Sequence, residues 1–277
     1  MIIDSHHHLW AFNEEEYGWI PKGSPIRANF LLPELEEATK SANVDGTVVV
    51  QARQVIEESE ALIAMGKQSD VIKGIVGWVP LIDEDVEKYL ELYSADPKFV
   101  AVRHVLQGEE DEYFLRPDFH RGLSKLPSHN LRYDLLLFQH QLPVATQLVD
   151  KQPELGIIVD HIAKPEIHNG RIEPAWRAGM QELAKRENIL GVKVSGMVNE
   201  VKDEDIDQAT LHNYFDEALE IFGADRVMFG TDWPVCLERI ESYKAWVDMV
   251  HAFTADLSTS EQEAIWANNC KKAYQLP

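Results

Sequence analysis

Short runs of apolar residues alternate with longer amphipathic stretches along the whole chain. The apolar runs lie at residues 1–10, 46–52, 72–81, 99–107, 132–140, 156–165, 189–197 and 226–235. Segments such as TVVV, LLLF and IIVD within them do not alternate between apolar and polar positions. Strands that are buried on both faces of a parallel sheet have this pattern. The runs therefore predict eight strands of a sheet that is covered by helices.

Between these runs, apolar residues recur three and four positions apart, which is the spacing of an amphipathic helix. The spacing predicts helices over 32–43, 55–70, 83–96, 173–188 and 211–223, with weaker patterns over 117–126, 142–151, 238–253 and 259–274. Acidic residues in the first turn of the first two segments suit a helix N-terminus. Gly223 is a plausible C-cap of the fifth.

Eight strands that alternate with helices predict a single α/β domain over residues 1–277, a (β/α)8 or TIM barrel. The alternative is a doubly wound open sheet, which usually carries a Gly-rich phosphate loop after its first strand. This chain has no such loop. In a barrel the active site lies at the C-terminal ends of the strands. We therefore expect the long connections 11–31 and 108–116 to line the mouth of the site.

Composition narrows the class of protein. Apolar residues at 45% and charged residues at 26% are ordinary for a soluble globular protein. The formal charge of −21 repels nucleic-acid backbones and anionic membranes, so we expect neither as a partner. The chain has no secretory signal pattern, no membrane span and only two cysteines. We expect a cytoplasmic protein that acts on a small molecule, with homo-oligomer formation left open.

The opening stretch MIIDSHHHLW is either the remnant of an affinity tag or the first strand of the barrel. Six of the eleven histidines fall at the ends of the apolar runs, namely His6, His7, His8, His104, His140 and His161. Such clustering favours a site at one face of the barrel. Alternate residues of a strand point to the same side, so His6 and His8 should project together while His7 faces away.

His6 and His8 form a two-imidazole clamp for a divalent metal ion. Asp232, in the segment FGTDWP at the eighth strand end, can complete the ligand set, and His161 is a candidate further ligand. Asp232 can also act as a general base toward water. The competing interpretation of Asp232 is a helix N-cap or a turn residue before Pro234.

Other strand ends carry candidates for substrate contact, which are Gln51, Arg53, Trp10, Trp78, Arg103, His104 and His140. Arg103 can polarise a carbonyl or hold a carboxylate, although an ion pair with an acidic residue is a competing role. Since His104 is the next residue, we expect it to point the opposite way. Core packing is the default role of the tryptophans, with stacking on a sugar-like ring as the alternative.

Two further polar residues lie on the sixth and seventh strands. Asp160 precedes His161, and the side chains of neighbouring strand residues diverge. We therefore expect His161 to point inward and Asp160 to take a supporting position. For Lys193, a structural role inside the barrel and a functional one are equally well supported by its position.

With these residues assembled, the chain resembles the amidohydrolase superfamily, and within it the amidohydrolase-2 branch of sugar-lactone hydrolases that are like L-fuconolactonase and L-rhamnonolactonase. The resemblance covers nearly the whole chain and rests on IDSHHHLW, VAVRHVLQ, FQHQLP, VDHIAKP, VKVSGM and MFGTDWPVC, in the family's order. It implies a barrel hydrolase with His6, His8, His161 and Asp232 in the reaction centre. It also implies that Arg103, His104 and His140 lie around the substrate.

One departure from the superfamily pattern concerns the metal. The fourth strand ends in Arg103 and His104, without a lysine that could be carbamylated or a bridging glutamate. The resemblance therefore implies at most one divalent ion, zinc or manganese, which some members of the branch do not need. It implies hydrolysis of the lactone of a sugar acid or a similar small hydroxy acid. The alternatives are a metal-dependent decarboxylase of an aromatic or unsaturated acid, and a barrel that binds a sugar acid without catalysis.

Overall fold

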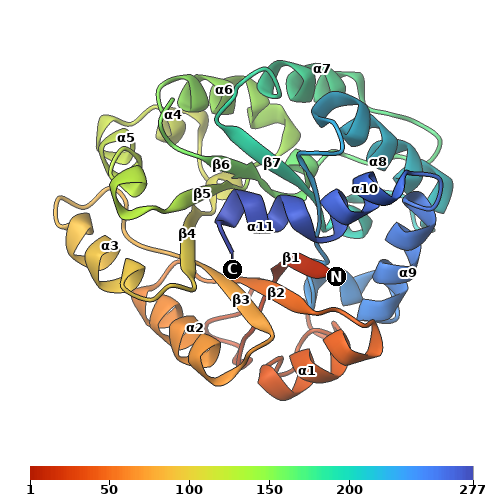
Figure 1. Cartoon of the computed structure of the whole chain (residues 1–277), viewed down its shortest axis with the longest axis horizontal. Coiled ribbons are helices and arrows are strands. Elements are labelled where there is room, and N and C mark those ends of the chain that lie inside the picture. Colours follow the sequence, from red (N-terminus) through yellow and green to blue (C-terminus); the bar gives the residue numbers. More distant parts are fainter. Residues whose placement is uncertain (277) are drawn as a thin grey trace.

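The structure is a computed structural model that describes residues 1–276, and it contains a barrel of eight parallel strands (Figure 1). The strands are β1 (Ile3–His7), β2 (Gly46–Val50), β3 (Ile72–Gly77), β4 (Phe99–His104), β5 (Arg132–Leu135), β6 (Ile157–Val159), β7 (Ile189–Val194) and β8 (Val227–Phe229). Their order in the sheet follows their order in the sequence. The predicted (β/α)8 barrel is confirmed.

The first and last strands meet at their C-terminal ends and close the barrel there. The backbone nitrogen of Asp232 donates to the carbonyl of His6 at 2.8 Å, and that of His8 donates to the carbonyl of Trp233 at 2.7 Å. These bonds hold the loop after β8 directly against the histidines of β1. Two segments that are more than 220 residues apart in sequence thus share one seam.

Helices form a ring around the strands (Figure 1). They are α1 (Leu32–Ser41), α2 (Ile56–Gln68), α3 (Val86–Ser94), α4 (Asp111–Phe114), α5 (Pro117–Leu123), α6 (Leu142–Asp150), α7 (Pro174–Leu183), α8 (Gln208–Phe222), α9 (Tyr243–Phe253), α10 (Thr259–Glu263) and α11 (Asn269–Tyr274). Each predicted helical stretch overlaps a helix, although α8 begins three residues earlier than predicted, and the last stretch is divided by a π-turn into α10 and α11. The single-turn helix α4, inside the connection 108–116, was not predicted.

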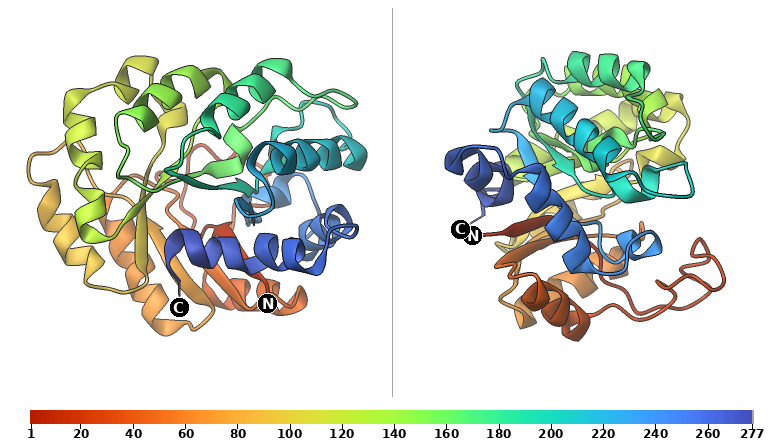
Figure 2. Two further views of the ribbon diagram at one scale, coloured as in Figure 1. Left: turned by 45° about the horizontal axis from the view of Figure 1, so that its top comes forward. Right: turned by 90° about the vertical axis from the view of Figure 1, so that its right-hand side faces the viewer.

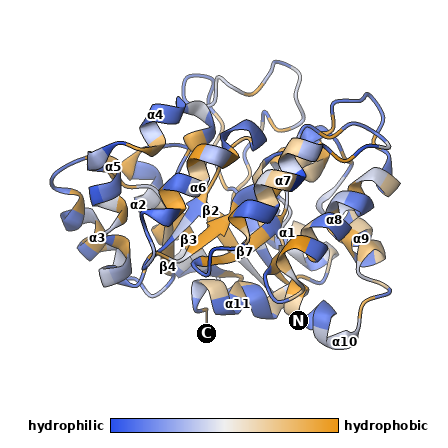
Figure 3. Cartoon of the chain, turned by 90° about the horizontal axis from the view of Figure 1, so that it is seen from above, coloured by the Kyte–Doolittle hydropathy of each residue, from blue (hydrophilic) through white to orange (hydrophobic). Residues whose placement is uncertain are grey.

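The apolar faces of these elements meet in the interior. The outer faces of the strands pack against the helices in one large buried cluster. Figure 3 accordingly shows hydrophobic strands enclosed by helices with hydrophilic outer surfaces. A second cluster joins strand residues inside the barrel, such as Val48 and Val76, to Cys270 and Tyr274 of α11. Helix α11 therefore closes the end of the barrel where the strands begin (Figure 2).

The opposite end, where the strands finish, is bordered by loops. Residues 11–31 form a long loop that extends from the barrel (Figure 2, right). Its base is held by paired backbone bonds between Trp10 and Phe30, at 2.8 and 2.9 Å. Since α11 closes the other end of the barrel, a ligand can enter at the end where the strands finish. Among residues 1–276, no helix combines the length and apolar character that crossing a membrane requires.

Candidate active site

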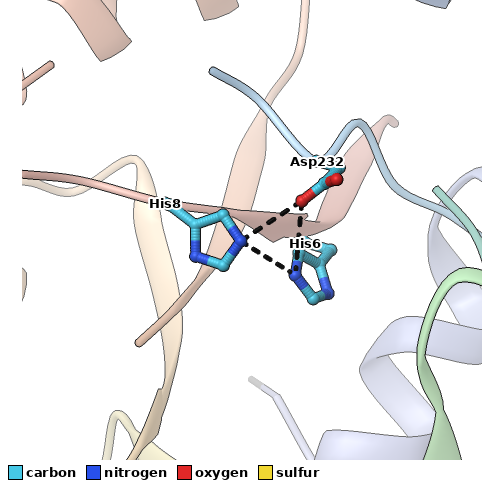
Figure 4. A group of neighbouring side chains, drawn as sticks. All are labelled: His6, His8 and Asp232. Carbon is cyan, nitrogen blue, oxygen red and sulfur yellow. Dashed lines mark hydrogen bonds and ion pairs between the residues drawn. The ribbon is translucent and has the colours of Figure 1, made fainter. Parts of the chain in front are cut away.

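Three buried side chains converge at the seam between the first and last strands (Figure 4). The Nε2 atoms of His6 and His8 lie 3.3 Å apart. Asp232 Oδ1 lies 3.2 Å from Nε2 of His8 and 3.8 Å from Nε2 of His6. His161 adds a fourth ligand-type atom, because its Nε2 is 3.8 Å from the same carboxylate oxygen. The structure thus brings together the four residues that were predicted to form the reaction centre.

The other ring nitrogen of each histidine faces away from this cluster. Nδ1 of His8 is 2.8 Å from the carbonyl oxygen of Val50, so it carries the proton and leaves a lone pair on Nε2. Nδ1 of His161 is 2.8 Å from Ser195 Oγ, and Nδ1 of His6 is 3.3 Å from Asp160 Oδ1. Such outer contacts are typical of metal-binding histidines, because they orient the ring.

The spacing of the cluster fits a divalent metal ion. Tetrahedral zinc, with bonds of about 2.0–2.1 Å, separates neighbouring ligand atoms by about 3.3–3.4 Å. The separations among His6, His8 and Asp232 run from 3.2 to 3.8 Å. Imidazole nitrogen and carboxylate oxygen are also ligands that zinc accepts. We infer that these three residues can hold one ion, with His161 placed as a further ligand.

Protonation states in the cluster suit this role. Burial alone would raise the pKa of Asp232, but the imidazoles of His161, His8 and His6 hold it below its ordinary value. Burial lowers the pKa of His161 to about 4 and that of His6 well below its ordinary value. At neutral pH, Asp232 is therefore a carboxylate and these two rings are neutral. Metal ligation and general-base catalysis both need these states.

The backbone after β6 differs from the prediction. The strand ends at Val159, and residues 161–164 all have positive φ, with His161 at 51°. The expectation that Asp160 and His161 diverge was wrong, because both follow the strand and are not part of it. Both side chains turn toward the barrel interior. Asp160 lies behind His6 and forms ion pairs with Arg103 at 3.0 Å and Lys193 at 2.8 Å.

The cluster opens into a cavity of about 250 Å³ at the strand ends. His8, His161 and Asp232 line it, together with Arg103 and Lys164. Apolar surface comes from Trp10, Trp19, Ala52, Val105, Leu136 and Val235. A cavity that combines a few convergent polar groups with apolar walls is the usual form of a small-molecule site.

Two of the predicted substrate residues, Arg103 and Trp10, line this cavity. His104 points the opposite way from Arg103, as expected for neighbours on β4, and stacks on Tyr113 with ring centroids 4.9 Å apart. Trp78 donates its indole N–H to His104 at 3.4 Å and lies with it outside the cavity lining. Gln51 is buried behind Arg103, and its side-chain amide donates to the Arg103 carbonyl at 3.3 Å.

The structure does not bring Arg53 and His140 into the cavity. Arg53 forms ion pairs with Glu58 at 2.7 Å and Glu16 at 2.6 Å, so it fastens the loop 11–31 to the barrel. His140 is exposed and borders a neighbouring hollow, because the chain turns into a short 3₁₀ helix after Phe138. His7 faces away from the cluster, as predicted, and its Nε2 lies 3.0 Å from Thr47 Oγ1.

The sequence placed Trp19 near the same face as Trp10, with core packing as its default role, and the structure shows that it lines the cavity. Gln107 of the cavity appeared only within the motif VAVRHVLQ, and sequence reasoning missed two residues below the cavity. Asp134 and Tyr274 form a buried pair inside the barrel, with the Tyr274 hydroxyl donating to both carboxylate oxygens at 2.8 and 2.7 Å. No sequence signal marked this pair, because its members are 140 residues apart.

Known proteins are similar to this chain in sequence and fold. The model of the Amidohydro_2 family, described as amidohydrolase, matches residues 3–276. An L-fucono-1,5-lactonase of Burkholderia multivorans is 31% identical over 99% of this chain and 96% of its own length. An L-rhamnono-gamma-lactonase of Scheffersomyces stipitis is 22% identical over 99% of this chain and 98% of its own. A Burkholderia multivorans amidohydrolase solved with bound zinc superimposes with a TM-score of 0.94 at 29% identity, over 100% of both chains.

Proposed function

Since the chain belongs to the amidohydrolase family whose model it matches over residues 3–276, we propose that it hydrolyses the lactone of a sugar acid. The observation that carries the proposal is the convergence of Asp232 with the Nε2 atoms of three histidines beside a small cavity. The L-fucono-1,5-lactonase and L-rhamnono-gamma-lactonase among the relatives support a lactone as the substrate class.

Asp232 is the general base of the proposed reaction. Its Oδ1 faces the imidazoles, which leaves Oδ2 to take a proton from a water molecule. The resulting hydroxide attacks the carbonyl carbon of the lactone, and the bond between that carbon and the ring oxygen breaks. The proton held by Asp232 then passes to the departing ring oxygen, so that the product is an open hydroxy acid.

The carbonyl oxygen gains negative charge during this attack, and positive groups at the cavity stabilise it. Arg103 lines the cavity, and its buried Nε has no hydrogen-bond partner among residues 1–276. Because Nε is shielded from solvent, the contribution of Arg103 is the positive charge of its guanidinium beside the cavity, which favours an oxyanion there. A divalent ion held by His6, His8 and Asp232, with His161, would add Lewis-acid polarisation of the carbonyl.

A panel of aldonolactones tests the proposal. In weakly buffered solution with a pH indicator, each lactone that is opened at neutral pH releases one proton. We expect acid release with at least one sugar lactone, and we expect exhaustive chelation to lower the rate by about tenfold or more. One equivalent of zinc or manganese should restore it.

Two outcomes would contradict parts of this proposal. No acid release from any lactone, with carbon dioxide release from an aromatic acid, would assign the site to a decarboxylase. Full activity of a chain that is free of metal by mass spectrometry would show that Arg103 and the imidazoles suffice to polarise the carbonyl.

Gly196 provides a test of how closely His161 must be placed. It follows β7 with a φ of 65°, and a Cβ there would lie 2.8 Å from His161 Nδ1 and 3.0 Å from Asp232 Oδ2. We expect Gly196→Ala to displace both side chains and to lower kcat/KM by about 10²-fold, as small misplacements do. Steady-state kinetics on the best lactone would measure this.

Gly170→Ala is the matched control. Gly170 has a similar φ of 74°, but nothing lies within 4 Å of its Cβ position. Both variants therefore introduce the same backbone strain, and only Gly196→Ala reaches the site. Equal kinetic losses in the two variants would contradict the assignment of His161 and Asp232.

A further inference from the structure

A second group of ligand-type side chains adjoins the first inside the barrel. His6, Asp160 and His161 each offer a ligand atom within 4.8 Å of the others, and His6 belongs to both groups. Taken by itself, this second group would be a place for a second divalent ion. The surrounding side chains show what fills that place.

The ammonium of Lys193 contacts two members of this group, Asp160 and His6. Its Nζ is 2.8 Å from Asp160 Oδ1, 2.5 Å from Asp134 Oδ2 and 3.2 Å from His6 Nδ1. Two carboxylate oxygens therefore contact Nζ, and carboxylate oxygen is also a ligand for a divalent ion. Lys193, Asp134 and Asp160 are all fully buried, so water does not screen these charges.

Arg103 supplies a second fixed cation beside Asp160. Its Nη1 is 3.0 Å from Asp160 Oδ2 and 3.3 Å from His6 Nε2. Both oxygens of Asp160 thus face positive side chains of the protein itself. A divalent ion added beside Asp160 Oδ1 would lie a few ångströms from the buried Lys193 ammonium in an interior of low dielectric, where like charges repel strongly.

We propose that Lys193 is the built-in cation of the second metal position, so that the barrel holds one divalent ion, at His6, His8 and Asp232. In this arrangement Lys193 is a positioning residue. Its ammonium pairs with Asp134 and Asp160 and keeps Asp160 beside His6, on the side away from the ion. The inference rests on the proposed ion at the first group, but its test measures metal binding and not turnover.

The test removes the ammonium in two ways. Lys193→Ala removes the charge and opens space between Asp134 and Asp160, whereas Lys193→Met removes the charge and keeps the space filled. Metal-free proteins are titrated with manganese(II) and followed by calorimetry, with bound metal counted by mass spectrometry. We expect one ion per chain in the wild type, two in Lys193→Ala and one in Lys193→Met.

Thermal unfolding gives a second readout. Removing one partner of a buried ion pair leaves uncompensated charge, so both variants should unfold at lower temperature than the wild type. Manganese in excess of one equivalent should raise the melting temperature of Lys193→Ala only, because only this variant has room for the replacement cation.

Three results would overturn the proposal. They are two ions bound by the wild type, one ion bound by Lys193→Ala, or equal responses of the two variants to excess manganese. The wild-type count remains decisive even where a variant fails to fold. A chain that binds one ion but opens no lactone would refute the proposed function and leave this inference standing.

Discussion

Replacing Asp232 with asparagine will lower kcat for lactone hydrolysis by about 10²–10⁴-fold, the range that a general base contributes. Asparagine keeps the shape of the side chain but cannot take a proton from water. The imidazoles hold the pKa of Asp232 below its ordinary value despite burial, so the carboxylate persists as the pH falls from neutral toward 5. Because Asp232 stays ionised over that interval, its titration should not lower the wild-type rate there.

The measurement is kcat on the best lactone, with circular dichroism and zinc content as checks on fold and metal. Glu109→Gln is the matched carboxylate-to-amide control. Glu109 lies near the mouth and pairs with His104 at 2.9 Å, but it does not line the cavity. We expect its kcat to stay close to that of the wild type. Near-normal turnover by Asp232→Asn, with full metal content, would remove Asp232 from the role of base.

The barrel could be predicted from the sequence because each of its elements has a local signature. Strands such as Gly46–Val50 are buried on both faces and read as continuous apolar runs. The joint projection of His6 and His8 was also predictable from the alternation of side chains along a strand, although β1 is irregular between Asp4 and His7 and His8 lies one residue beyond its end. Asp232 could be placed beside them because β8 closes the barrel against β1.

The placement of Asp160 could not be predicted in the same way, because residues outside the apolar run contact the backbone there. The indole of Trp176, on α7, donates to the carbonyl of Ile162 at 2.6 Å, within the segment of positive φ. The local pattern of apolar and polar residues does not reveal a contact between two separate elements. The apolar run 156–165 was therefore taken as one long strand, although β6 ends at Val159.

Ion pairing sets the roles of two further residues, Arg53 and Lys193. Arg53 looked like a free cation at a strand end, but Glu58 of α2 and Glu16 of the loop 11–31 both pair with it. The structural and functional roles of Lys193 could not be separated because its partners, Asp134 and Asp160, come from two other strand segments. Sequence patterns thus located the charged residues, whereas the pairing that sets their roles depends on the closed barrel.

Replacing Gly122 with alanine will lower the free energy of unfolding by about 3 kcal/mol, at the upper end of the usual effect of overpacking. Gly122 lies in α5, and a Cβ there would be 2.0 Å from the carbonyl oxygen of Leu81. Because Leu81 contributes backbone atoms, a change of rotamer cannot relieve the contact. Helix α5 must therefore move away from the segment that follows β3.

Gly66→Ala is the matched control, because it also places alanine in a helix but creates no contact with backbone atoms. Gly66 lies in α2, where a Cβ would be 2.8 Å from Ile75 Cδ1, the tip of a flexible side chain. Both changes favour the helix by up to about 1 kcal/mol, since alanine is the better helix former. Urea unfolding should therefore show a large drop in midpoint for Gly122→Ala and little change for Gly66→Ala. Similar midpoints for the two would mean that α5 can shift away from Leu81 at little cost.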